Sequence, residues 1–189
     1  MPAARAPRKD AVANRARILA AAAEVFRREG FGVGVEKIAR EAGINVATLY
    51  RNFPSKSALM LAVGESLLEP CRAARDAAMA GGGPDVVGRF LVAQVDVYAE
   101  NRGVVDAFSR GDVDPEVRAE LVAMAIDILA PLAERGHRDG SLAVALDTQD
   151  LLVALRMITG AVITSGTIDR DPRAYAEILA RGLREPAAG

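Results

Sequence analysis

The side chains best suited to chemistry gather in one short segment, residues 45–56 (NVATLYRNFPSK). Its polar members are Asn45, Thr48, Tyr50, Arg51, Asn52 and Lys56. Their amide, hydroxyl, guanidinium and ammonium groups form hydrogen bonds, and the last two also neutralise anions. The segment therefore indicates recognition of a polar, negatively charged partner rather than bond-making chemistry.

The rest of the chain offers no catalytic or metal-binding pattern. One His and one Cys cannot build a multi-His or multi-Cys metal site. No Ser lies in a G-x-S-x-G turn, no phosphate-binding P-loop is present, and no close carboxylate pair stands out. We therefore expect a protein that is not an enzyme and that uses neither a metal nor a cofactor.

Composition is compatible with a packed core and a cytoplasmic location. Hydrophobic residues make up 51% and charged residues 26% of the 189 positions. The single Cys71 cannot form an internal disulfide, which suits a reducing cytoplasm. No apolar run approaches the roughly 20 residues of a membrane span. The basic N-terminus has no apolar segment behind it, so we do not expect a secretory signal.

Two short amphipathic helices should position the polar segment. Each has side chains at i, i+3, i+4 and i+7 on one face: Val35, Ile38, Ala39 and Ala42 in the first, and Val46, Leu49, Tyr50 and Phe53 in the second. Gly43 should end the first helix, Ile44 should fill the turn, and Asn45 should cap the second helix. Two helices joined by a short turn that contains Gly are typical of a helix-turn-helix, although an ordinary helical hairpin in a core has the same pattern.

Charge is distributed unevenly along the chain. Residues 1–60 hold 11 basic and 5 acidic side chains, a net charge of +6. The remaining residues hold 13 basic and 20 acidic side chains, a net charge of −7. A basic unit joined to an acidic body indicates that the first part meets a polyanion.

The segment from Ile18 to Leu61 resembles the DNA-binding domain of the TetR (tetracycline repressor) family. The matching residues have fixed spacing across three helices and two turns: Ile18–Ala22, Phe26, Gly30, Phe31, Val35, Ile38, Ala39, Ala42–Ile44, Thr48–Tyr50, Asn52, Phe53, Ser55, Lys56 and Leu59. The resemblance covers about the first third of the chain. It implies a helix-turn-helix regulator whose second helix, from Val46 to about Asn52, enters the major groove of DNA.

The resemblance also implies a role for each candidate DNA-binding residue. Val46, Ala47 and Thr48 open the reading helix and should face base edges, where a methyl group can meet thymine and a hydroxyl can donate or accept. Arg51 and Asn52 should reach phosphates or flanking bases, and the family places phosphate contacts at Tyr50 and Lys56. The complete set is Asn45, Val46, Ala47, Thr48, Tyr50, Arg51, Asn52 and Lys56.

The sequence departs from the family pattern at two positions. The family usually has Thr before the position of Val35, where it caps the helix and contacts a phosphate, and Gly34 has no hydroxyl to do either. Ala47 stands where the family often has Gly, which is a milder change. One side-chain contact to DNA is therefore expected to be lost.

The remainder of the chain should form further helices and make the fold all-α, with about nine helices. Asp114–Pro115 is a strong helix start, Asp171–Pro172 should start another helix, and either Asp147 or Thr148 should cap the helix between them. Pro70 and Pro131 should kink or interrupt the helices that contain them. We expect three units: a disordered basic arm at 1–10, a helix-turn-helix DNA-binding domain at 11–56, and a helical effector-binding and dimerisation domain at 57–189. The first helix of the DNA-binding domain should run from about Ala11 to Glu29.

Polar residues isolated within apolar helices predict an effector pocket in the body, because ligand sites combine apolar walls with a few polar groups. The candidate lining residues are Phe90, Gln94, Tyr98, Phe108, Met124, Asp127, Arg156 and Met157. Asp127 and Arg156 could instead be solvated, and Arg156 could pair with an acid as a structural bridge.

We therefore expect a homodimer that binds double-stranded DNA at a palindromic operator, acts as a repressor, and is released by a small-molecule effector. By resemblance to the family, the last two helices should form the dimer interface, although their apolar stripes could instead fill the core of one subunit. The alternatives are a DNA-binding or scaffold protein that responds to no ligand, and, as a weaker alternative, an enzyme. No membrane partner is expected.

Overall fold

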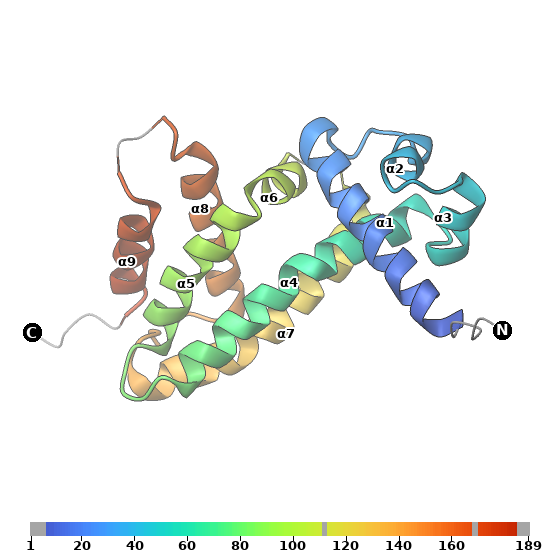
Figure 1. Cartoon of the computed structure of the whole chain (residues 1–189). Coiled ribbons are helices and arrows are strands. Elements are labelled where there is room, and N and C mark those ends of the chain that lie inside the picture. The colour runs from blue at the N-terminus through green and yellow to red at the C-terminus, as the bar shows by residue number, and fades with distance from the viewer. Residues whose placement is uncertain (1–6, 111–112, 168–169, 185–189) are drawn as a thin grey trace, which may run out of the picture.

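The computed structural model describes residues 7–110, 113–167 and 170–184, and every regular element in these ranges is an α-helix (Figure 1). The helices are α1 (Pro7–Glu29), α2 (Val35–Glu41), α3 (Val46–Asn52), α4 (Lys56–Ala80), α5 (Val86–Glu100), α6 (Arg102–Ser109), α7 (Pro115–Asp139), α8 (Thr148–Thr164) and α9 (Pro172–Gly182). The expected all-α fold is confirmed for this part of the chain.

Local capping chemistry sets most of the helix starts. The Ser55 hydroxyl accepts the N–H of Ala58 at 3.0 Å and begins α4. Asp114, followed by Pro115 in the first turn, caps α7. Asp147 caps α8 in a reciprocal capping box with Asp150. Each cap satisfies backbone donors that have no partner within the helix, which is why these starts are predictable from the sequence.

The first helix begins earlier than expected. The structure starts α1 at Pro7, four residues before the expected start at Ala11, so residues 7–10 are helical rather than part of a disordered arm. Proline is well suited to a first helical turn because its missing N–H would have no partner there. Residues 1–6 of the expected arm lie outside the described residues.

Two prolines lie inside long helices without dividing them. Pro70 lies within α4 and Pro131 within α7, and both helices run for 25 residues. Of the two predicted outcomes, a kink or an interruption, the interruption is wrong, and a kink at these positions stays a prediction. An internal proline costs about 3 kcal/mol, and packing of α4 and α7 along each other and against α5 offsets that cost.

Helices α4 and α7 lie side by side and connect the two ends of the molecule (Figure 1). Helices α1, α2 and α3 lie at one end, and α8 and α9 lie at the other (Figure 1). Helix α5 packs against α4, α7, α8 and α9, which accounts for its apolar sequence. We call α1–α3 the head and α5–α9 the body; α4 joins them.

Two clusters of buried apolar side chains hold the protein together. The head core contains large buried side chains such as Ile18, Phe26 and Leu49, but it extends into α6 and the start of α7 through Val104 and Val117. The body core joins α5, α7, α8 and α9, with Ala78 from the end of α4: Val86, Val87, Phe90, Leu91, Val95, Leu129, Leu132, Leu151, Leu155, Ile158 and Ala176 are among its members. The proposed division between residues 56 and 57 therefore does not coincide with a gap between the two cores, and the domain boundary stays a prediction.

Three phenylalanines link the body to the head. Phe108 of α6 packs edge-on against Phe31 with ring centroids 4.7 Å apart. Phe31, which follows α1, packs at the same centroid distance against Phe26 of α1. Such tilted aromatic pairs stabilise by more than their buried area alone, so α6 is attached directly to the head as well as through α4.

Candidate nucleic-acid interface and body cavity

The turn between α2 and α3 is built as the sequence predicts. Gly43 adopts a positive φ of 64°, and the N–H of Ile44 donates to the carbonyl of Ala39 at 3.0 Å. This is the hydrogen bond of a Schellman helix end, which favours Gly because a side chain is strained at positive φ. Ile44 is partly buried against the head core. The Asn45 side chain accepts the N–H of Thr48 at 2.7 Å and caps α3.

Two arginines of α1 hold this turn and α3 in place. The guanidinium of Arg17 donates to the carbonyl of Ala42 at 2.6 Å, at the end of α2. The guanidinium of Arg15 lies 4.3 Å from the ring centroid of Phe53 and donates to the carbonyl of Asn52 at 3.2 Å. Helix α3 is therefore fixed on α1 as well as on α2.

Helix α3 buries one face and exposes another. Leu49 and Phe53 are almost fully buried in the head core. Ala47, Tyr50 and Arg51, spaced i, i+3 and i+4, are exposed, and Tyr50 retains 45% of its accessible surface. Val46, Thr48 and Asn52 are partly exposed beside them. The structure therefore places the predicted reading residues on one accessible surface, which we call the α3 face.

Several polar groups of the α3 face already bond to one another. The guanidinium of Arg51 donates to the hydroxyl oxygen of Thr48 at 2.7 Å, and the Asn52 amide donates to the Thr48 carbonyl at 2.8 Å. Thr48 accepts from Arg51, so its own proton remains available to donate. The Arg51–Thr48 bond holds two of the predicted DNA-binding side chains in a defined arrangement.

The edges of the α3 face carry Lys56 and Gly34. Lys56 is the first residue of α4 and is partly exposed, and no acidic residue lies in that first turn. Gly34 precedes α2 in an extended conformation and provides no side-chain cap, as the missing hydroxyl requires.

Ion pairs neutralise part of the positive charge of the head. Arg28 pairs with Glu41 at 2.9 Å, and Lys37 pairs with Glu29 at 2.7 Å. Within the part of the chain that the structure describes, Arg51 and Lys56 form no ion pair. Cations without acidic partners therefore lie on or beside the α3 face.

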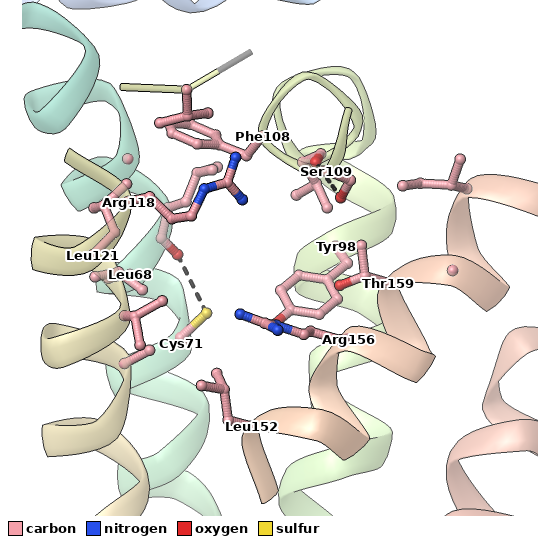
Figure 2. Close-up of a pocket in the computed structure, with 18 residues that line it drawn as sticks. Leu68, Cys71, Tyr98, Phe108, Ser109, Arg118, Leu121, Leu152, Arg156 and Thr159 are labelled. Atoms are coloured by element: carbon pink, nitrogen blue, oxygen red, sulfur yellow. Dashed lines mark hydrogen bonds between the residues drawn. The ribbon is translucent and has the colours of Figure 1, made fainter. Parts of the chain in front are cut away.

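The body encloses a cavity of about 630 Å³ that opens to solvent (Figure 2). Five helices and the segment before α7 form its wall. The lining residues are Gly64, Leu67, Leu68 and Cys71 of α4, Tyr98 of α5, Val105, Phe108 and Ser109 of α6, Val113 between α6 and α7, Arg118, Leu121, Val122 and Ala125 of α7, and Leu152, Arg156, Thr159, Gly160 and Ile163 of α8. Its volume is within the range of small-molecule sites.

The cavity includes Tyr98, Phe108 and Arg156 of the predicted pocket residues. Phe90 and Gln94 are not on its wall. Phe90 is buried in the body core, and Gln94 is fully buried where its amide oxygen faces the Cys71 thiol at 3.1 Å. Both were expected to line the pocket; they share a side of α5 with Tyr98 but lie one and two turns before it, where the helix packs into the protein.

Met124, Asp127 and Met157 are also not on the cavity wall, which corrects the expected list. On α7 the cavity-facing stripe is Arg118, Leu121, Val122 and Ala125, at i, i+3, i+4 and i+7. Asp127 is exposed, and Met157 retains 56% of its accessible surface on the outside of α8. Helical periodicity within α7 could have identified these four cavity-facing residues only if the side of α7 that faces α4 and α8 had been known.

Burial raises the pKa of two groups on the cavity wall, the thiol of Cys71 and the phenol of Tyr98. Desolvation raises the pKa of the Cys71 thiol to about 11, although nearby Arg72 opposes the shift. Desolvation also raises the pKa of Tyr98, which shares a hydrogen bond with Thr159. At neutral pH the thiol and the phenol are neutral, and the charged side chains on the described wall are Arg118 and Arg156.

No described helix is long and apolar enough to cross a membrane. Among the described residues there is likewise no cluster of His, Cys, Asp and Glu side chains suited to a metal ion.

Residues 18–63 match the family model described as bacterial regulatory proteins, tetR family. The chain is also 37% identical over 84 residues to the HTH-type transcriptional regulatory protein RaaS of Mycobacterium tuberculosis. That match covers 44% of this chain and 39% of the relative, so it spans well under half of the curated protein.

Solved structures extend the similarity to nearly the whole chain. The TetR transcriptional regulator SCO0520 from Streptomyces coelicolor is 25% identical with a TM-score of 0.59, covering 92% of this chain and 99% of that one. The regulator FadR from Bacillus subtilis, solved in complex with stearoyl-CoA, is 19% identical with a TM-score of 0.72, covering 89% and 96%. The second likeness is one of fold.

Proposed function

Because the chain belongs to the TetR family of transcriptional regulators, we propose that it is a homodimeric repressor that leaves a palindromic operator when a small molecule occupies the body cavity. The observation that carries the proposal is the α3 face, where Ala47, Tyr50 and Arg51 are exposed on a helix anchored by buried Leu49 and Phe53. We place this activity in the cytoplasm, where bacterial DNA lies, and assign the protein no enzymatic role.

In this proposal the α3 face enters the major groove, where each base pair presents a distinct edge. Ala47 and Thr48 meet base edges, with the Thr48 hydroxyl free to donate. Tyr50, Arg51 and Lys56 contact phosphates, and these contacts position the protein without reading the sequence.

The dimer uses the outer surface of α8, with α9 beside it. Val153, Met157, Gly160 and Thr164 are exposed at i, i+4, i+7 and i+11, and Val153 and Met157 retain 53% and 56% of their accessible surface. Ile178 of α9 is 48% exposed. Large apolar side chains left in water on one helix face support a contact with a second subunit. Light scattering after size-exclusion chromatography tests this: Met157→Glu should yield a monomer, whereas Met79→Glu on α4 should leave a dimer.

Release of DNA requires the effector to bind the non-DNA conformation more tightly, and a coupling of about 1–3 kcal/mol is usual. The cavity is suited to this because its wall includes residues of α4 and α6. Helix α4 leads directly into the head, and Phe108 of α6 packs on Phe31. An effector that displaces either helix changes the placement of the two heads of the dimer.

The decisive experiment is fluorescence anisotropy with a random-site DNA library at two salt concentrations. Selection of a palindrome with salt-dependent affinity supports the proposal. Weak, unselective binding that disappears at the higher salt concentration refutes it. Thr48→Ala should change which sites are selected, whereas Thr167→Ala, an exposed threonine beyond α8, should select the same sites as the wild type.

A further inference from the structure

The chemical class of the effector follows from the polar groups on the cavity wall. We infer that the cavity binds an amphiphile with an apolar body and an oxyanion end, a carboxylate or a phosphate monoester, and that Arg156 pairs with the oxyanion. This inference rests on the proposed effector role of the same cavity.

The first argument is the charge of the wall. The charged side chains on the described wall are Arg118 and Arg156, and none of the described lining residues is acidic. Most of the other wall residues are aliphatic or aromatic. Arg156 is exposed at the opening of the cavity, and its positive charge beside the apolar wall favours an anion and disfavours a cation.

The second argument is the use of the wall's hydrogen-bond donors. The hydroxyl of Thr159 donates to the Leu155 carbonyl at 3.0 Å, and that of Ser109 donates to the Val105 carbonyl at 2.9 Å.

The thiol of Cys71 has its own acceptors, the carbonyl of Leu67 at 3.3 Å and the amide oxygen of Gln94 at 3.1 Å. The hydroxyl protons of Thr159 and Ser109 and the thiol proton of Cys71 thus have acceptors within the protein. Arg156 differs: in the part of the chain that the structure describes it forms neither an ion pair nor a hydrogen bond with the protein.

The third argument is the position of Arg156. It reaches from α8 across the opening between α8 and α4, beside Tyr98 and toward the wall that carries Cys71 (Figure 2). Its guanidinium offers several N–H groups in one plane, a geometry that matches carboxylate or phosphate oxygens. The apolar body of the ligand would then lie along Leu67, Leu121 and Phe108, farther into the cavity.

The test is isothermal titration calorimetry of the full chain with four probes that share a ten-carbon chain: decanoate, decyl phosphate, 1-decanol and decyltrimethylammonium. Decanoate or decyl phosphate should bind about tenfold or more tightly than decanol, as expected when a charged hydrogen bond is added. Decyltrimethylammonium should bind least. The ranking of decanoate against decyl phosphate distinguishes a carboxylate ligand from a phosphate ligand.

Two variants with the same change in charge separate a site from a general effect. Arg156→Gln should remove the preference for the anion over decanol, whereas Arg138→Gln, on the exposed end of α7 away from the cavity, should keep it. Equal binding of decanoate and decanol, unchanged binding in Arg156→Gln, or no binding of any probe would each overturn the inference.

These results do not depend on DNA. If the protein selects a palindrome but binds none of the probes, the assignment of ligand class fails and the DNA-binding proposal stands. If decanoate binds through Arg156 but leaves the operator complex intact, the ligand class stands and the effector-release proposal fails.

Discussion

Replacing Lys56 with Ala should weaken DNA binding while stabilising the protein. Lys56 is the first residue of α4, and no acid lies in that first turn. A cation at a helix N-terminus is disfavoured by about 0.3–1 kcal/mol. In a chain of this size 1 kcal/mol corresponds to about 2–4 °C in melting temperature. We therefore expect Lys56→Ala to melt about 1–4 °C higher than the wild type.

The loss of DNA affinity should appear in its salt dependence. One phosphate contact contributes about 0.9 to the slope of log K against log salt concentration, so loss of Lys56 from both subunits should flatten the slope by about 1.8. Between 50 and 200 mM salt the variant should then lose about 12-fold less affinity than the wild type. Because a phosphate contact carries no sequence information, the order of preferred sites should not change.

Lys37→Ala is the matched control, because Lys37 pairs with Glu29 at 2.7 Å. Anisotropy titrations at four salt concentrations and thermal melts of all three proteins test the reasoning together. An unchanged slope in Lys56→Ala would remove Lys56 from the phosphate-contacting set. A lower melting temperature would mean that Lys56 has a structural role that outweighs the helix dipole.

Three further changes test the cap, the cavity thiol and the close approach at α4. Asn45→Ala removes the acceptor for the Thr48 N–H and should cost about 1 kcal/mol in urea unfolding, whereas Asn45→Asp should retain the cap. Burial raises the pKa of Cys71 from 9.0 to about 11. Between pH 9 and 11 the unfolded chain therefore binds fewer protons than the folded chain, so the free energy of unfolding should fall as the pH rises through this range. The fall should be less steep in Cys71→Ala. In Gly64→Ala the new Cβ would lie 2.5 Å from Leu121 Cδ1, so the Leu121 side chain must change its rotamer. Because Leu121 lines the cavity, calorimetry should show weaker binding of the ten-carbon probes. The loss of stability should be small, since the higher helix propensity of Ala partly offsets the overpacking.

The head could be predicted from the sequence because its determinants are local. Gly43, Asn45 and Ser55 each act within a few residues along the chain, and their turn or cap appears where the sequence predicts it. The apolar stripe of α2 likewise follows from helical spacing. The stripe predicted for α3 holds for Leu49 and Phe53, but Tyr50 remains 45% exposed, because the same spacing rule does not tell which edge of the stripe faces the core.

The cavity could be predicted only in part, because its wall depends on how distant helices are rotated against one another. Arg156 and Asp127 both read as isolated polar residues in apolar helices, yet the fold turns Arg156 toward the cavity and Asp127 toward solvent. Gln94 is buried but satisfies the thiol of Cys71, a contact between α4 and α5 that no spacing rule within one helix predicts.

The continuity of the head core into α6 and α7 has a practical consequence for protein engineering. A chimera that joins residues 1–56 to the body of another regulator would separate Phe31 from Phe108, and the buried side chains of α1 from Val104 and Val117. Such a graft would expose apolar surface on the transplanted piece and leave a void in the recipient. A reporter built from this head should therefore carry matching residues at those body positions into the recipient, so that the junction is designed as a three-dimensional surface instead of a point in the chain.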